Sequence, residues 1–151
     1  MLRNCLLLLA ATFAALAAEP TPKRAFLRLG GATQILDADG KVTWQYPAET
    51  RDGCVLPNGN LLLVLAKSKA YPGGAVIEVT RELKVLFEYK GTQAEVNTAQ
   101  RLAEGRTLIS EAGPRPRLLE VDAAGCIQAE ITLQCSAKDP HFQSRMARPL
   151  P

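Results

Sequence analysis

The chain has 151 residues, of which 47% are hydrophobic and 22% are charged, a composition typical of a globular domain and not of a disordered segment. Its 18 Lys and Arg residues against 15 Asp and Glu give a formal net charge of +3, and only 5% of the residues are aromatic. These values argue against a nucleic-acid partner, which needs a basic cluster with interleaved aromatic residues.

The N-terminal residues have the pattern of an export signal. Within residues 1–18, one cation, Arg3, precedes an apolar run over Cys5–Ala17, and there is no acidic residue. This pattern predicts a secretory signal peptide that is cleaved at its end, with residues 19–24 as a linker. A membrane anchor is the alternative, but it needs about 20 apolar residues, and the run is shorter. We therefore expect an exported protein, in the periplasm or outside the cell, with no membrane contact after cleavage.

The cysteine content predicts neither a disulfide framework nor a metal site. Three cysteines remain after cleavage, an odd number, and we expect them to be small buried hydrophobic residues. The chain has no CxxC motif and only one histidine, so the sequence predicts no metal and no cofactor. The three residues are Cys54, Cys126 and Cys135.

Residues 25–151 contain internally similar segments. ILDADGKVTWQY at 35–46, EVTRELKVLFEY at 78–89 and EVDAAGCIQAEI at 120–131 align without a gap, at spacings of 43 and 42 residues. CVLPNGNLLL at 54–63 aligns with QRLAEGRTLI at 100–109, at a spacing of 46 residues. Similarity at a nearly fixed period predicts a repeat of one structural unit.

Each unit contains short segments in which apolar and polar residues alternate, which is the period of a β-strand. The segments are separated by turn residues such as Asn58-Gly59 and Glu104-Gly105, which favour tight hairpins. We expect strands, in chain order, at 25–29, 32–37, 41–46, 51–56, 61–66, 75–80, 84–89, 96–102, 106–111, 117–122 and 126–133, and a last one within 142–151.

Four antiparallel strands in each unit of about 45 residues predict an all-β fold made of β-propeller blades, because such a sheet must stack on its neighbours to bury both faces. The chain then forms an incomplete propeller domain over 25–151, with two full blades, three strands of another and one extra strand. The simplest interpretation is that further blades follow Pro151. Alternatively, the last strand completes the first blade of the same chain, which gives three blades that associate through two exposed blade faces. A β-sandwich is the alternative fold, but it does not require the same turn in each unit.

Three segments resemble known propeller blades: NGNLLLV at 58–64, GRTLISEAGPRPRLLEVDAAG at 105–125, and DADGKVTWQY at 37–46. They are similar to blades of the PQQ-like (quinoprotein-alcohol-dehydrogenase-like) superfamily and of arylsulfotransferase-like propellers. The resemblance covers residues 32–151 and implies that Trp44 and Phe87 pack between blades. Quinone binding does not carry over, because those dehydrogenases have tryptophans in blade after blade and this chain has one Trp.

The propeller prediction also indicates where a ligand would bind. In such folds the first strand of each blade lines the central channel, and one set of loops shares the ligand-binding face. Four residues near this face could offer hydrogen-bond donors and positive charge to an anionic or sugar-like ligand. Alternatively, they are solvated residues or partners of Glu95 and Asp139. The loops are 47–52, 67–74, 90–96, 112–116 and 134–141, and the four candidate ligand-binding residues are His141, Arg145, Asn97 and Arg101.

We therefore expect a binding or scaffold module whose partner is a protein or a small molecule such as a carbohydrate. The alternative is a channel-centred propeller enzyme. The resemblance to arylsulfotransferase-like propellers implies a catalytic histidine, for which this chain offers only His141, and no motif aligns the two. No residue is assigned a catalytic role.

Overall fold

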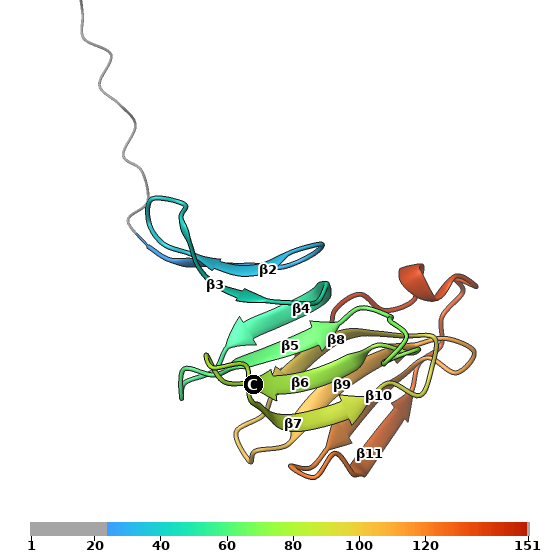
Figure 1. Cartoon of the computed structure of the whole chain (residues 1–151). Helices are drawn as coiled ribbons and strands as arrows, with labels where there is room; N and C mark the ends of the chain where they lie inside the picture. The colour runs from blue at the N-terminus through green and yellow to red at the C-terminus, as the bar shows by residue number, and fades with distance from the viewer. Residues whose placement is uncertain (1–23, 151) are drawn as a thin grey trace, which may run out of the picture.

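The computed structural model describes residues 24–150, so the predicted signal peptide and most of the linker lie outside the described residues. Strands and one short 3-10 helix, η1 (Pro140–Phe142), are the regular elements of this part (Figure 1). None of its helices is long and apolar enough to cross a membrane. The all-β prediction is confirmed for the described part.

The strands form three antiparallel sheets that follow one another along the chain. In each sheet, neighbouring strands are also consecutive in sequence, and the eleven strands lie at the first eleven predicted positions. The first sheet has β1 (Phe26–Arg28), β2 (Thr33–Leu36) and β3 (Val42–Tyr46); the second has β4 (Thr50–Val55), β5 (Leu61–Leu65), β6 (Ala75–Val79) and β7 (Val85–Lys90); the third has β8 (Glu95–Arg101), β9 (Thr107–Ala112), β10 (Arg117–Val121) and β11 (Ile127–Thr132).

The prediction of a last strand within 142–151 is wrong for the residues that are described. Residues 143–150 follow η1 as a segment that joins no sheet. The segment is held by side chains instead, and Asn97 Nδ2 donates to the Ser144 carbonyl at 2.8 Å. Pro149 has no amide to donate to a ladder, and residues 143–150 pair with no strand of the described part.

The three internally similar segments form hairpins of the same geometry. At Gly40, Leu83 and Gly125 the backbone φ is 79°, 66° and 81°. Each of these amides donates to the carbonyl three residues earlier, at 3.0 to 3.1 Å. The strand register then shifts at equivalent positions of the three sheets, at Ile35, Glu78 and Glu120.

Leu83 carries backbone strain that the two equivalent glycines avoid. Left-handed backbone costs an L-residue roughly 1–2 kcal/mol, and the Leu83 side chain is exposed. We expect Leu83→Gly to raise the free energy of unfolding by about 1 kcal/mol, because the relief of strain exceeds the extra entropy that glycine loses on folding. Urea denaturation measures the change. The control is Leu86→Gly, at an exposed position of the edge strand β7, which should lower the free energy of unfolding. If Leu83→Gly lowered it as well, the backbone at Leu83 would not be strained.

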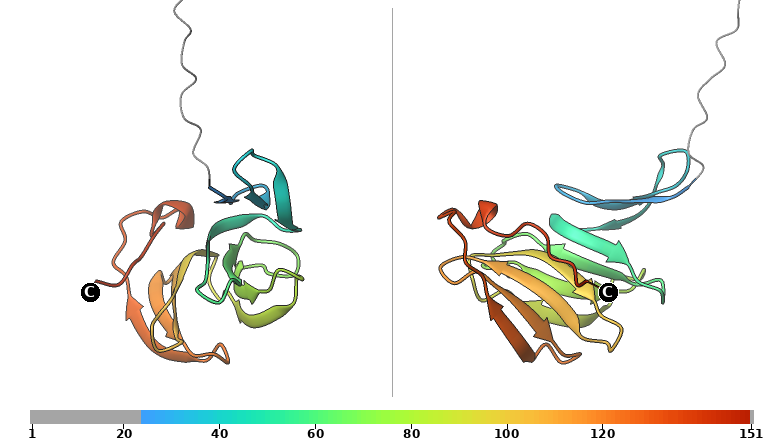
Figure 2. Two further views of the ribbon diagram at one scale, coloured as in Figure 1. Left: turned by 90° about the vertical axis from the view of Figure 1, so that its left-hand side faces the viewer. Right: turned by 180° about the vertical axis from the view of Figure 1, so that it is seen from behind.

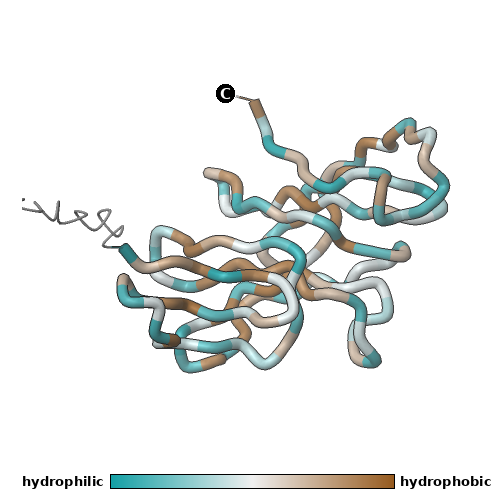
Figure 3. Tube along the Cα trace, turned by 90° about the horizontal axis from the view of Figure 1, so that it is seen from above, coloured by the Kyte–Doolittle hydropathy of each residue, from teal (hydrophilic) through white to brown (hydrophobic). Residues whose placement is uncertain are grey.

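The second sheet is buried on both faces. All five residues of β5 are buried. Leu62 and Val64 belong to a core that is shared with the third sheet, whereas Leu61, Leu63 and Leu65 belong to a core that is shared with the first. Figure 2 shows the sheets stacked in chain order, and in Figure 3 several hydrophobic stretches lie where segments of the chain run side by side. A two-layer sandwich has no sheet that is covered on both faces, so that alternative does not describe the fold.

The two aromatic residues that were predicted to pack between sheets do so. Phe87 is buried in the core between the second and third sheets. Trp44 is partly buried and packs against the core between the first and second sheets. Their positions in these cores confirm the prediction that they serve packing.

The prediction of buried cysteines is wrong. Cys54 and Cys126 are exposed and Cys135 is half-buried, and all three are free thiols. Cys54 lies on β4, which is an edge strand of its sheet, and Cys126 follows a hairpin turn, where its amide donates to Asp122. Cys54 and Cys126 are therefore exposed because of their positions on an edge strand and in a turn, although a cysteine side chain is apolar enough to be buried.

Candidate functional site

The five loops that were predicted to share one face are connected at one end of the sheets. Hydrogen bonds join each loop to the next one along the chain, or to a residue one or two positions outside it. The links are Ala66 N to Glu49 O at 3.0 Å, Gly91 N to Gly74 O at 2.9 Å, Arg115 N to Gln93 Oε1 at 3.2 Å and Gly113 N to Gln143 Oε1 at 2.8 Å.

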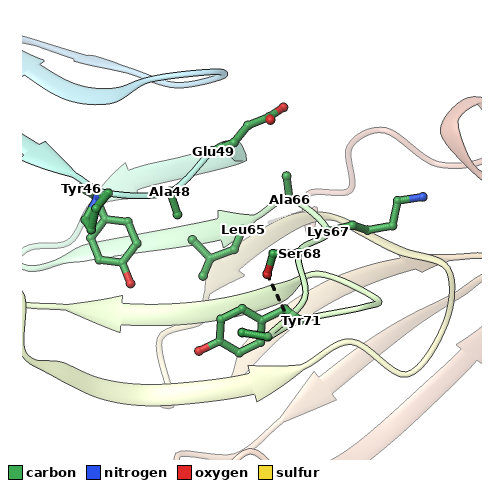
Figure 4. A pocket seen from close by; sticks show the side chains of 10 residues that line it. Tyr46, Ala48, Glu49, Leu65, Ala66, Lys67, Ser68 and Tyr71 are labelled. Atoms are coloured by element: carbon green, nitrogen blue, oxygen red, sulfur yellow. Dashed lines mark hydrogen bonds between the residues drawn. The ribbon is translucent and has the colours of Figure 1, made fainter.

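A cavity of about 370 Å³ opens at this end, between the first and second sheets. Figure 4 shows the rings of Tyr46 and Tyr71 near Leu65, while the charged ends of Glu49 and Lys67 point away from these rings. The cavity is therefore largely apolar, with polar groups at its rim. Its lining residues come from loops 47–52 and 67–74 and the ends of the strands beside them: Tyr46, Pro47, Ala48, Glu49, Leu65, Ala66, Lys67, Ser68, Ala70 and Tyr71.

The hydroxyl group of Tyr71 is held as a hydrogen-bond donor. It donates to Glu88 Oε2 at 2.7 Å. This hydrogen bond raises the pKa of Tyr71 to about 12 and lowers the pKa of the Glu88 carboxyl. Burial raises the pKa of Tyr46 as well. Both phenols are thus protonated at neutral pH, and both can exchange hydrogen bonds with a ligand.

The two tyrosines are positioned by different contacts. The Tyr71 amide donates to Ser68 Oγ at 3.1 Å, which holds the loop between β5 and β6 in a turn. Tyr46 stacks on Trp44 with ring centroids 6.2 Å apart. Because Trp44 itself packs against the core, the Tyr46 ring rests on a supported surface.

A cluster of charged side chains adjoins the cavity and is centred on Glu95. The Glu95 side chain is 7% exposed, and Oε1 lies 3.1 Å from Lys67 Nζ and accepts from Arg51 Nη2 at 3.1 Å. Oε2 is 3.0 Å from Arg51 Nη1, but at an angle that makes no hydrogen bond, and it is 3.8 Å from His141 Nδ1. A buried carboxylate oxygen is therefore left without a hydrogen-bond donor beside a histidine.

Strand bulges aim two residues at this end of the molecule. Arg51 has no partner residue in the pairing of β4 with β5, and Asn97 has none in the pairing of β8 with β9. A bulge leaves its extra residue outside the ladder and redirects the side chain. Arg51 thereby reaches Glu95, and Asn97 reaches the Ser144 carbonyl.

The structure brings only part of the predicted site together. Arg145 Nη1 lies 2.6 Å from His141 Nε2, and Arg51 Nη1 lies 3.3 Å from His141 Nδ1. A neutral imidazole has one acceptor nitrogen, so His141 accepts from one of the two arginines. Asn97 is buried and anchors the C-terminal segment instead of facing the cavity.

Arg101 lies away from the other predicted residues, at the opposite end of β8. It donates to Glu78 Oε2 at 2.8 Å, and its guanidinium carbon is 4.9 Å from the centre of the Phe87 ring. These contacts join the second and third sheets, so Arg101 has a packing role in the structure.

Two of the predicted loops, 47–52 and 67–74, contribute to the cavity, but the four candidate residues do not line it. Tyr46, Lys67 and Tyr71 were not among the four candidates, although two of the named loops contain or flank them. Tyr71 has a recognisable sequence signal, because it is an aromatic residue that precedes Pro72 and Gly73 in a predicted loop.

Comparisons with known proteins show similarity of fold. No family model matches the sequence, and no curated protein matches it. Among solved structures, the crystal structure of a protein of unknown function from Bacteroides caccae is similar, with a TM-score of 0.64 and 22% sequence identity. The match covers 80% of this chain and 44% of that chain, so this chain spans less than half of that protein's length. At this identity the likeness concerns the fold alone.

Proposed function

We propose that this chain is an exported β-propeller binding module, whose sheets are consecutive blades and whose loop end binds a small carbohydrate-like ligand between the first two blades. The cavity carries the proposal. Its volume of about 370 Å³ falls in the usual range for small-molecule sites, about 300–1,000 Å³. Ligand sites also tend to form where two structural units meet.

The chemistry of the cavity favours a ring with an apolar face and several hydroxyl groups. The aromatic faces of Tyr46 and Tyr71 can contact the C–H face of a sugar ring. The two phenols and the Glu88 carboxylate can exchange hydrogen bonds with sugar hydroxyls. Because the ammonium group of Lys67 is paired with Glu95, we expect an uncharged ligand to bind here.

Titration with simple glycosides tests the proposal. Trp44 is the single tryptophan and stacks on Tyr46, which lines the cavity, so we expect Trp44 fluorescence to report binding of methyl β-D-glucoside or methyl β-D-galactoside. We expect Tyr71→Ala to raise the Kd about tenfold, a loss of about 1.4 kcal/mol from one ring contact and one hydrogen bond. Tyr71→Phe, which removes only the hydroxyl, should have a smaller effect.

Phe142→Ala is the matched control, because Phe142 is an exposed aromatic residue in η1 that does not line the cavity. It should leave the Kd unchanged. A titration in which no glycoside gives a saturable signal, or in which Tyr71→Ala binds as well as the wild type, would refute the carbohydrate site.

A channel-centred enzyme is the second candidate function. The observation in its favour is the buried Glu95 carboxylate, whose Oε2 accepts no hydrogen bond and lies 3.8 Å from His141 Nδ1. A carboxylate beside a histidine is a common acid–base pair. Release of 4-nitrophenol from 4-nitrophenyl sulfate, with phenol as acceptor, would favour this function if His141→Gln abolished it.

A further inference from the structure

The outer face of the third sheet lacks the cover that the equivalent face of the second sheet has. Val76, Phe87 and Tyr89 of the second sheet are buried against the third. All of β11 is exposed, and Ile131 is 62% exposed. No sheet among residues 24–150 lies over this face. The residues of the third sheet that are equivalent to the buried three, 42 positions later, are Leu118, Ala129 and Ile131.

The first sheet has a free face and a free edge. β1 pairs only with β2, so its other edge is open in the described part of the chain. Phe26 is exposed and lies opposite Leu36, which gives the free face an apolar end. The rest of this face is polar, where Arg28 donates to Gln34, and Gln34 Nε2 donates to Gln45 Oε1 at 3.1 Å.

The C-terminal segment occupies the place beside β8 that β8 itself occupies beside β4. Arg148 Nη1 donates to Thr98 Oγ1 at 2.6 Å, and Arg148 Nη2 lies 3.3 Å from Asp52 Oδ2. Ser144 Oγ is 3.0 Å from Ser110 Oγ. Residues 143–150 thus lie where the first strand of a following sheet would lie, and within residues 24–150 no three further strands complete such a sheet.

We propose that a second copy of this chain supplies those strands. The first sheet of one copy docks on the outer face of the third sheet of the other, and the C-terminal segment pairs with the open edge of β1. An extended segment that adds to a free sheet edge gains main-chain hydrogen bonds, and pairing removes an exposed edge. Three strands and one segment then make one four-stranded sheet of the same order as the second and third sheets.

The same junction forms at both ends of each copy, so the two-copy assembly closes on itself. The described part of each chain has three sheets, and a closed ring of two such parts therefore has six, within the range of about four to eight blades of propellers. This inference rests on the blade arrangement of the proposed function.

Light scattering coupled to gel filtration tests the assembly on the purified chain. We expect the wild type to have the mass of two chains over a range of concentrations. Ile131→Lys on the third sheet and Gln45→Lys on the first sheet should each reduce the mass to that of one chain, with unchanged circular dichroism. Leu86→Lys is the control, because Leu86 is 50% exposed on β7, outside both surfaces, and it should keep the mass of two chains.

A wild type with the mass of one chain, or a two-chain species that neither Ile131→Lys nor Gln45→Lys dissociates, overturns the assembly. This test and the glycoside titration can fail independently of each other. A single chain that still binds a glycoside overturns only the assembly, whereas a two-chain species without glycoside binding overturns only the ligand site.

Discussion

Glu111→Ala will lower the free energy of unfolding by about 3–5 kcal/mol, because it breaks a buried ion pair by removal of one partner. Glu111 is fully buried. Its Oε2 lies 2.9 Å from Arg117 Nη2 and accepts from Arg117 Nε at 2.9 Å, while Oε1 accepts from the Tyr89 hydroxyl at 3.0 Å and from the Thr92 amide at 2.7 Å. The substitution leaves Arg117 Nε, the Tyr89 hydroxyl and the Thr92 amide without this acceptor, whereas Arg117 Nη2 still donates to Thr92 Oγ1 at 2.6 Å.

The network joins the second sheet to the third, so its loss weakens the contact between the two sheets. Burial and the Glu111 carboxylate both raise the pKa of Tyr89, which keeps this phenol a donor to Glu111. Urea denaturation followed by circular dichroism measures the change.

Glu130→Ala is the control for Glu111→Ala. It removes the outer partner of the same Arg117, at 2.7 Å, but Glu130 is 30% exposed and water can replace it. We expect a loss of no more than about 1 kcal/mol, as for exposed ion pairs. Equal losses for the two variants would show that the burial of Glu111 is not what stabilises the network.

Leu62→Ala and Leu63→Ala will each lower the free energy of unfolding by about 2–5 kcal/mol. The two residues are neighbours on β5, and successive side chains of a strand point to opposite faces. Leu62 packs toward the third sheet and Leu63 toward the first, and both are essentially inaccessible to solvent. Each truncation therefore leaves a cavity in a different core.

The pair of substitutions tests the three-layer packing. In a sheet with one solvated face, only one of two neighbouring side chains is buried, so truncation of the other would hardly change the stability. Leu86→Ala, at an exposed position of β7, should change the stability by less than about 0.5 kcal/mol. If one of the two β5 variants were as stable as the control, the second sheet would have only one buried face. Chemical denaturation of the three variants measures the difference.

The sequence was sufficient to predict the strands because their signals are local. Alternation of apolar and polar residues and turns such as Asn58-Gly59 depend on neighbouring residues alone. The segment 142–151 has a similar composition, but a strand also needs a partner with free hydrogen-bonding groups. The segment meets side chains of β8 and β9 instead of an open edge, and this could not be read from its own residues.

The candidate site was only partly predictable because its contacts join residues that are distant in sequence. The positions of the loops could be predicted, because they are the connections between the predicted strands. The bulge at Arg51 has no sequence signal of its own, yet it directs this residue toward Glu95. The hydrogen bond from Tyr71 to Glu88 crosses from a loop to an edge strand. The number of charged neighbours around His141 likewise depends on how the loops meet.

Amide chemical shift mapping with methyl β-D-glucoside, by two-dimensional NMR of the isotope-labelled chain, tests most directly whether the cavity between the first two sheets binds a carbohydrate. We predict saturable shifts of the amides of the cavity-lining residues at 46, 48–49, 65–68 and 70–71, and unchanged amides at Gly59 and Gly105 in the hairpins of the opposite end. Shifts that cluster at those hairpins, or no saturable shift with any simple glycoside, would contradict a carbohydrate site at this end of the molecule.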